Sequence, residues 1–339
     1  MEFLPTLWFV IIAYLWTGYL LLEGFDLGVG MLMKLFARTD RDRRVLLNTV
    51  GPVWDGNEVW LITAGAATFA AFPLWYASLF STLYLPLLLV LMGLIFRAVG
   101  FEYRGKGDTE AWRNRWDWAI ALGSLVSAFG IGAALALTTT GLPINANGDR
   151  EGGAFAWFNG YAVLGGSAVV LFSLVHALGF LVLKTDGDIR NRARRQFLRW
   201  LPLGLLPMAG WAIVVHATGG KTVTLLTLVI AVVGAVYAWS MARRRRDGWS
   251  FVGMAVFLAA GTTTIFTAAF PVVLPSTLDA AFDLTVSNAS SSGYTLGVMS
   301  VVALVGLPAV LVYQGWTYWV FRKRVSRSQI PTAHAVRAQ

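Results

Sequence analysis

Residues 4–33 read LPTLWFVIIAYLWTGYLLLEGFDLGVGMLM, a long run that is apolar except for one glutamate and one aspartate in its second half. The hydrocarbon core of a bilayer is about 30 Å thick, and a helix of roughly 20 apolar residues crosses it. This run is therefore long enough to span a membrane. Similar runs recur along the chain, and together they predict an all-α polytopic membrane protein.

The composition supports this class of protein. Of the 339 residues, 57% are hydrophobic and only 13% are charged, whereas a soluble globular chain carries about 25% charged residues. We expect a single transmembrane domain over residues 1–321, followed by a cytoplasmic tail over residues 322–339. Nine transmembrane helices are predicted: Leu4–Met33, Gly51–Phe72, Trp75–Gly100, Trp118–Thr140, Ala162–Leu183, Leu201–Ala217, Thr222–Met241, Ser250–Phe270 and Tyr294–Phe321.

The basic residues indicate how the helices are oriented. All of the 27 lysines and arginines except Arg150 and Lys221 fall at every second connection or in the tail. Cytoplasmic loops carry the excess of basic residues, so the N-terminus is predicted outside and the C-terminus in the cytoplasm. The run Arg243–Arg246 is interpreted as part of this signal and not as a nucleic-acid site, so no nucleic-acid partner is expected.

Several kinds of site are excluded or disfavoured. The chain has no cysteine, which excludes disulfides, iron–sulfur clusters and thiol catalysis. It has only three histidines. His176 lies inside a predicted span, where a hydrogen bond to a neighbouring helix is favoured over ligation of a haem. We therefore predict no metal site in this chain.

The informative residues are acids within the predicted spans, since a carboxylate at a helix centre costs about 2.5 to 3.5 kcal/mol. Glu23 and Asp26 form one pair, and Asp55 and Glu58 form another. Residues three apart share a helix face, and the rise of about 1.5 Å per residue places both pairs near the cytoplasmic side. Arg97, near the end of the third span, is expected at the same level.

Two interpretations of this layer compete. The five groups could pair with one another only to fix helix packing, and Arg97 could be a simple cytoplasmic flank. Alternatively, the carboxylates could form a relay that takes up protons, as intramembrane acid chains do. Four acids facing one arginine exceed what a structural pairing requires, and this surplus favours the relay.

Four motifs, read in order, carry a resemblance to a known family. They are GFDLG at residues 24–28, WDGNEVWL at 54–61, FRAVGFEYR at 96–104 and WRNRWDW at 112–118. With these motifs the sequence resembles subunit II of cytochrome bd-type quinol oxidases over essentially its whole length. A proton-coupled secondary transporter is the alternative. It is disfavoured because the acids lie near one side and no paired broken helices are evident near the midplane.

The resemblance implies two four-helix bundles plus one peripheral helix in a bacterial cytoplasmic membrane. It implies a haem-bearing partner, subunit I, that holds haems b and d, oxidises quinol and reduces O2 to water with cytoplasmic protons. No haem is expected in this chain, whereas a structural quinone and a small single-helix accessory subunit are features of some members.

The resemblance also suggests roles for individual residues. Asp55 matches the family's proton path, and Glu23 and Asp26 match acidic positions of the first helix. Glu58 departs from the pattern, because an amide is expected there, so its role is open between joining the relay and tuning it. Supporting positions match at Trp54, Asn57 and Arg97.

Overall fold

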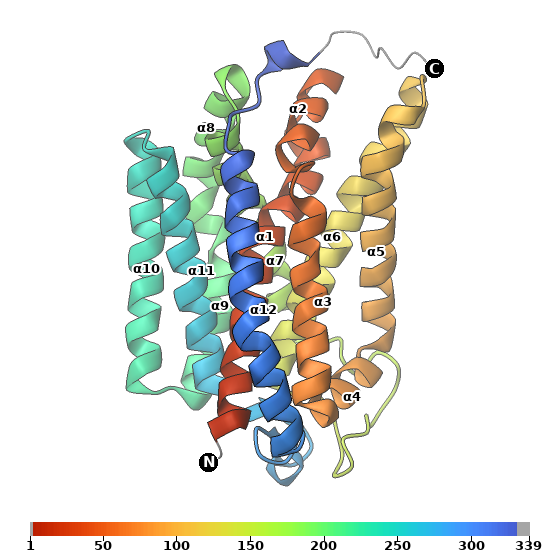
Figure 1. Cartoon of the computed structure of the whole chain (residues 1–339), viewed down its shortest axis with the longest axis vertical. Helices are drawn as coiled ribbons and strands as arrows, with labels where there is room; N and C mark the ends of the chain where they lie inside the picture. The colour runs from red at the N-terminus through yellow and green to blue at the C-terminus, as the bar shows by residue number, and fades with distance from the viewer. Residues whose placement is uncertain (1–2, 331–339) are drawn as a thin grey trace.

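The structure is a computed structural model that describes residues 3–330. Its longer helices run side by side along the long axis of the molecule (Figure 1). They are α1 (Phe3–Leu35), α3 (Trp54–Ala71), α5 (Tyr84–Tyr103), α6 (Glu110–Thr140), α7 (Gly160–Lys184), α10 (Thr222–Arg243), α11 (Asp247–Ala269) and α12 (Gly293–Val320). Shorter elements are α2 (Asp40–Val50), α4 (Pro73–Thr82), α8 (Gly187–Gly204), α9 (Leu206–Gly219) and the antiparallel pair β1 (Val272–Leu274) and β2 (Leu284–Thr285).

The helices confirm the predicted class of an all-α polytopic membrane protein. Within residues 3–330, eight helices are long and apolar enough to cross a membrane, when α8 and α9 are taken as one. The predicted second span corresponds to α3, which does not belong to these eight. Its first two turns carry Asp55, Asn57 and Glu58, and these polar side chains lower its hydropathy.

Two predicted spans are broken, and prolines explain both breaks. The expected helix Trp75–Gly100 is interrupted at Leu83, between α4 and α5. Pro86 lies in the first turn of α5, and a proline inside a continuous helix would lack a hydrogen bond and clash with the preceding turn. The expected helix Leu201–Ala217 is likewise interrupted at Leu205, two residues before Pro207 in α9.

Parts of two connections that were expected to be loops are helical. α2 has a capped start, where the Thr39 side chain accepts a hydrogen bond from the Asp42 backbone N–H at 3.1 Å. Val45 and Leu46 are buried beneath it. α2 and the first turns of α8 therefore cover one end of the helix assembly with short amphipathic helices.

α1 lies at the centre of the packing, in contact with α3, α6 and α7. Small residues allow the close approach of α1 and α7: a Cβ built on Gly28 would lie 1.9 Å from the Ser173 carbonyl oxygen. Gly24 and Gly28 of the GFDLG motif are small residues four apart, a spacing that is typical of close helix contacts in membranes. The buried second half of α1, Glu23 to Met33, is the segment that positions the candidate site.

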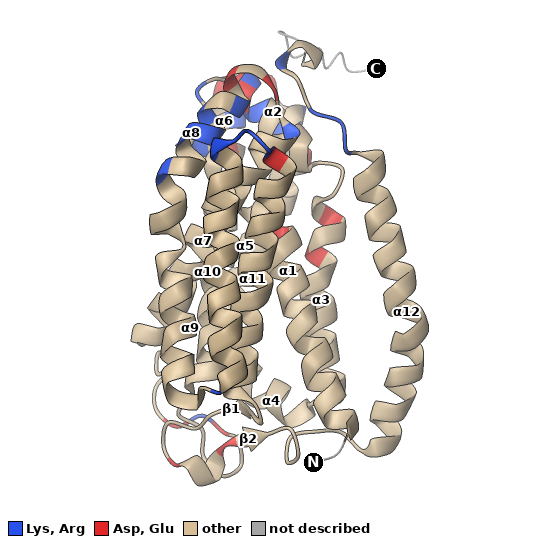
Figure 2. Ribbon diagram, turned by 90° about the vertical axis from the view of Figure 1, so that its left-hand side faces the viewer, with Lys and Arg blue, Asp and Glu red and all other residues tan. Residues whose placement is uncertain are grey.

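α12 stands apart from the other helices, beside α3 (Figure 2). Only 6% of its most apolar stretch is buried within the chain. Lysines and arginines gather at the end of the molecule where α1 and α12 finish, and few lie at the opposite end (Figure 2). The segregation of basic residues predicted from the sequence is thus present in the fold.

Candidate functional site: a buried carboxylate cluster

The site begins on α1 with two acids that are sealed from solvent. Glu23 and Asp26 each have 0% of their surface exposed. They lie one turn apart on the helix that packs tightly against α7 through Gly28. Burial of two carboxyl groups in an apolar interior is costly unless each finds a partner, so the neighbouring helices must supply polar groups.

α5 supplies the positive charge. The Arg97 guanidinium is completely buried, and its Nη1 lies 2.7 Å from Glu23 Oε1 and 3.8 Å from Glu58 Oε1. It also lies over the ring of Phe101, 5.0 Å from the centroid. Arg97 is therefore part of the cluster, and its interpretation as a simple cytoplasmic flank is wrong.

α3 supplies an amide that links three helices. Asn57 Nδ2 donates to Asp26 Oδ2 at 2.6 Å. The Asn57 carbonyl oxygen accepts hydrogen bonds from Gln314 Nε2 and from the Tyr318 hydroxyl, both at 2.9 Å. Asn57 thus ties Asp26 of α1 to α12, and these bonds are among the few polar contacts that hold α12 to the rest of the chain.

Gln314 and Tyr318 were missed by the sequence reasoning. Both lie in the apolar run of the last helix, one turn apart, on the same face. A glutamine inside such a run is the one signal that could have indicated them, because an uncharged polar residue in a span usually finds a partner on another helix.

Asp55 lies outside the buried cluster, in the first turn of α3. Its side chain is exposed at the surface of the chain, and its Oδ1 accepts a hydrogen bond from the Gly56 backbone N–H at 2.8 Å. Glu23, Asp26, Glu58 and Arg97 come together, whereas Asp55 makes no contact with Arg97 and lies near Glu58, whose carboxyl group is affected by its charge. α3 has only just begun at Trp54, and the side of the helix that meets α1 and α5 is the one that carries Asn57 and Glu58.

Two further predicted residues border the cluster. Glu58 follows exposed Asp55 by one turn on α3, is mostly buried, with 18% of its side chain exposed, and lies 3.8 Å from Arg97 of α5. Trp54 is half-buried, with its ring 5.1 Å from that of Phe101. The acids thus range from exposed Asp55 through mostly buried Glu58 on α3 to fully buried Glu23 and Asp26 on α1.

The cluster retains unused hydrogen-bonding capacity. The Glu23 and Asp26 carboxyl groups lie within hydrogen-bonding reach of each other, and within residues 3–330 the buried Arg97 Nε and Nη2 and the Tyr19 hydroxyl have no hydrogen-bond partner. Buried polar groups are rarely left in this state without a functional reason or a bound water. The paired carboxyl groups of Glu23 and Asp26 can share, bind and release a proton.

The histidine in the core is a packing residue. His176 Nε2 lies 2.9 Å from the Leu21 carbonyl oxygen, which confirms the expected hydrogen bond to a neighbouring helix. Its ring stacks between Phe172, with centroids 5.0 Å apart, and Phe251, 4.8 Å apart. No group of three or more potential ligands that could hold a metal ion occurs among residues 3–330.

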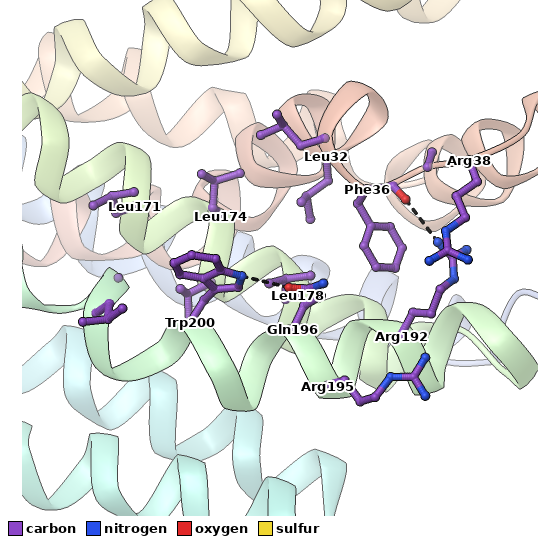
Figure 3. A pocket seen from close by; sticks show the side chains of 15 residues that line it. Leu32, Phe36, Arg38, Leu171, Leu174, Leu178, Arg192, Arg195, Gln196 and Trp200 are labelled. Carbon is purple, nitrogen blue, oxygen red and sulfur yellow. Dashed lines mark hydrogen bonds between the residues drawn. The ribbon is translucent and has the colours of Figure 1, made fainter.

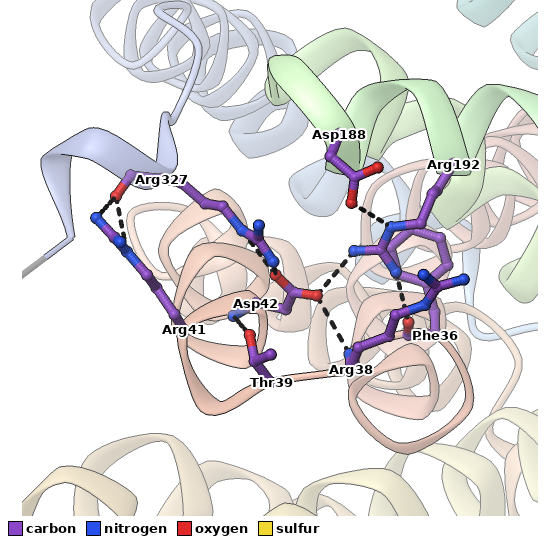
Figure 4. A network of polar contacts seen from close by, with 8 residues as sticks. All are labelled: Phe36, Arg38, Thr39, Arg41, Asp42, Asp188, Arg192 and Arg327. Carbon is purple, nitrogen blue, oxygen red and sulfur yellow. Dashed lines mark hydrogen bonds and ion pairs between the residues drawn. The ribbon is translucent and has the colours of Figure 1, made fainter. Parts of the chain in front are cut away.

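A second set of charged contacts closes the basic end of the molecule (Figure 4). Asp42 of α2 is buried and accepts hydrogen bonds from Arg192 Nη2 at 2.8 Å and from Arg327 Nε at 2.9 Å. Burial raises the pKa of Asp42, but hydrogen bonds from Arg327, the Arg38 backbone N–H and Arg192 outweigh this and hold the pKa below its usual range.

Asp247 of α11 also binds arginines at the basic end of the molecule. It accepts hydrogen bonds from Arg194 Nη2 at 2.5 Å and from Arg324 Nη2 at 3.2 Å, and it also pairs with Arg190. Arg324 and Arg327 both follow α12, so the two aspartates fasten the segment after α12 across the basic end.

Comparisons with known proteins agree with this architecture. Residues 4–321 match the family model of cytochrome bd terminal oxidase subunit II. Cytochrome bd ubiquinol oxidase subunit 2 of Bacillus subtilis is 41% identical over 97% of this chain and 99% of its own length. Cytochrome bd-I ubiquinol oxidase subunit 2 of Escherichia coli is 35% identical over 97% of each chain.

A solved structure shows the same fold. The bd oxidase from Geobacillus thermodenitrificans contains a chain that matches with a TM-score of 0.77 and 19% identity, over 95% of this chain and 100% of that chain. The helical architecture and the match over nearly the full length define a subunit of a membrane-bound terminal oxidase. The chain belongs to the cytochrome bd terminal oxidase subunit II family.

Proposed function

We propose that this chain is the haem-free second subunit of a bacterial quinol oxidase and provides the cytoplasmic entrance of its proton path. Quinol oxidation and the reduction of O2 to water would take place in a haem-bearing subunit I that holds haems b and d. The observation that carries the proposal is the series of acids from exposed Asp55 through Glu58 to buried Glu23 and Asp26. The named relatives are oxidase subunits, and nothing supports the transporter alternative.

The proposed topology has nine spans in two four-helix bundles and one peripheral helix. α3 is the span that hydropathy alone does not select, and α12 is the peripheral helix. Two observations support this topology: Phe3 and Val320 lie at opposite ends of the molecule, as an odd number of crossings requires, and the basic residues gather at the second end (Figures 1 and 2). The basic end is proposed to face the cytoplasm.

In the proposed path, a proton reaches Asp55 from the cytoplasm and passes to Glu58, which is 3.8 Å from Arg97. The positive guanidinium stabilises negative charge on Glu58 and Glu23, so it keeps both available to accept a proton. The neighbouring carboxyl groups of Glu23 and Asp26 then accept the proton in the interior. From there the proton would move toward the partner subunit. A small single-helix accessory subunit is proposed as a further neighbour of this chain.

A structural quinone is also proposed for this subunit, in the apolar cavity of about 660 Å³ between α3, α4, α5 and α6. Aromatic side chains, including Trp16, Phe69 and Tyr76, line this cavity and suit a planar ring. Trp75 also lines it, and its buried indole N–H has no hydrogen-bond partner within residues 3–330. That donor fits a quinone carbonyl, so Trp75 would orient the headgroup.

The experiment that tests the proton path is Asp55→Asn in the assembled oxidase. We expect quinol-dependent O2 consumption to fall by about a hundredfold or more, as for the loss of a general acid–base group, while the haem spectrum and assembly are retained. Asp55 is exposed, so its substitution does not disturb the core. Glu102→Gln, which removes another exposed carboxylate at the same end, is the matched control and should leave turnover unchanged. Normal turnover in a haem-replete Asp55→Asn complex would remove Asp55 from the path.

A further inference from the structure

A cavity of about 680 Å³ lies on a side of the molecule that the carboxylate cluster does not use. The end of α1 and the segment after it form one wall, α7 forms the floor and α8 forms the other wall (Figure 3). It extends from the basic end of the molecule down to Gly204, where α8 ends.

The inner part of this cavity is apolar. Leu171, Leu174 and Leu178 of α7 and Leu203 of α8 line it, and Leu203 and Leu171 are 55% and 36% exposed in the isolated chain. From Arg195 to Leu203 the α8 wall extends about 12 Å at 1.5 Å per residue. The lining is thus a strip of leucine side chains that is exposed at Leu171 and Leu203, is buried at Leu178 and follows the direction of a bilayer chain.

The outer part of the cavity is cationic. Arg192 is fully engaged there, because it donates to Asp42, Asp188 and the Phe36 carbonyl oxygen. Arg38 and Arg195 line the same end of the cavity and are exposed. Within the described residues, neither side chain takes part in a hydrogen bond or ion pair. Nearby aspartates therefore compensate the charge of Arg192 but leave two positive charges at the cavity mouth.

We propose that this cavity binds an anionic phospholipid of the cytoplasmic leaflet. The phosphodiester pairs with Arg38 and Arg195, and one acyl chain lies along the leucines of α7 and α8. Trp200, whose indole Nε1 donates to Gln196 Oε1 at 2.8 Å, lies at the boundary between the two parts, where tryptophans sit at membrane interfaces.

Charge and shape together favour a lipid over other occupants. A helix of a protein partner would have to bring two buried carboxylates to match the arginines, at a high cost within a membrane. Free phosphate would pair with the arginines but leave the leucine strip uncovered. An anionic lipid satisfies both parts at once. The site is separate from the proton path, so the two proposals can fail independently.

The test uses the purified, delipidated oxidase complex with the full chain, incubated with phosphatidylglycerol and analysed by native mass spectrometry. The variant Arg38→Gln/Arg195→Gln removes the charges, and Leu174→Trp fills the apolar part. The control variant Arg115→Gln/Arg244→Gln removes two other exposed arginines of the same end that do not line the cavity. Phosphatidylethanolamine and inorganic phosphate serve as competing probes.

We expect one retained phosphatidylglycerol per complex in the wild type and in the control variant. Each arginine near an anionic lipid headgroup is worth about fivefold in affinity, so the double charge variant should bind roughly thirtyfold more weakly. Leu174→Trp should also lose the lipid. Equal retention in wild type and double variant would overturn the proposal, as would equal loss in the control. Displacement of the lipid by phosphatidylethanolamine or by millimolar phosphate would overturn the choice of an anionic phospholipid.

Discussion

Arg97 carries a full charge in the interior of the chain, and its ion pair with Glu23 at 2.7 Å joins α5 to α1. Removing one member of a buried pair leaves an uncompensated charge, which typically costs about 3 to 5 kcal/mol. We therefore expect Arg97→Gln to lower the thermal unfolding midpoint of the complex strongly. Glu23→Gln should cost less, since Glu58 remains to pair with Arg97.

The double variant Arg97→Gln/Glu23→Gln gives this prediction a sharp control. If the two groups stabilise each other, the double variant should be more stable than the sum of the two single effects implies. Additive effects would contradict the pairing.

The pH dependence of turnover tests whether Glu23 also carries protons. Glu23→Gln should reduce oxidase turnover mildly and shift its pH profile, and an unchanged profile would argue against a protonic role.

Counting residues along each span was enough to predict that Glu23, Asp26, Glu58 and Arg97 meet at one level. The count could not predict that the Asp55 side chain is exposed. Residues three apart lie only approximately on one helix face, and the helices packed against α3 determine which of its sides is buried. The contact of Gln314 in α12 with the cluster could not be predicted either. A glutamine in an apolar span signals that a polar partner exists, but local sequence does not identify that partner, and Asn57 lies 257 positions away.

At the scale of helices, the crossing of α1 and α7 depends on the absence of a side chain at Gly28. An added Cβ there would meet the Ser173 carbonyl oxygen at 1.9 Å and the Ala177 Cβ at 2.5 Å. We expect Gly28→Ala to separate the two helices and destabilise the protein by about 1 to 3 kcal/mol, the usual cost of overpacking. A lower yield of assembled, haem-containing complex and a lower unfolding midpoint would be measured.

Gly306 of α12 is the matched control, because a Cβ there would meet no atom within 4 Å. Alanine favours a helix over glycine by about 1 kcal/mol, so Gly306→Ala should leave the yield unchanged or raise it. Equal losses in both variants would show that the contact at Gly28 is not the cause.

The helix breaks at Leu83 and Leu205 illustrate what hydropathy alone cannot resolve. Each broken span remains apolar throughout, so a hydropathy average joins its parts, although Pro86 and Pro207 were visible in the sequence. α2 was missed for the opposite reason: it is too polar to appear as a span, and the burial of Val45 and Leu46 depends on the helices beneath it.

On the scale of the whole molecule, α12 is fastened by the segment that follows it, through Arg327 on Asp42 and Arg324 on Asp247. We expect Asp42→Asn to lower the unfolding midpoint by the equivalent of roughly 3 kcal/mol, as for a broken buried ion pair. Asp188→Asn is the control. Its carboxylate is 55% exposed and pairs with Arg192 within one helix, so its loss should cost at most about 0.5 kcal/mol.

The difference in stability between the wild type and Asp42→Asn should depend on pH, because the pKa of Asp42 is lowered in the folded protein. A carboxyl group whose pKa is lower in the folded state contributes stability above its ordinary pKa of about 3.9, and that contribution disappears as the pH falls through the folded value. The gap between wild type and Asp42→Asn should therefore be constant from about pH 5 to 7 and narrow below about pH 4. A gap that widens on acidification would contradict this account.

The pairing of Glu23 with Arg97 also constrains how the protein is made. At about 5 to 20 residues per second, the ribosome needs roughly 4 to 15 seconds to add the intervening 70 or so residues. During that interval α1 holds two acids that have no cation to meet. Burial of the ionised Glu23 carboxylate therefore becomes favourable only after α5 has been made, because Arg97 is the cation that compensates it.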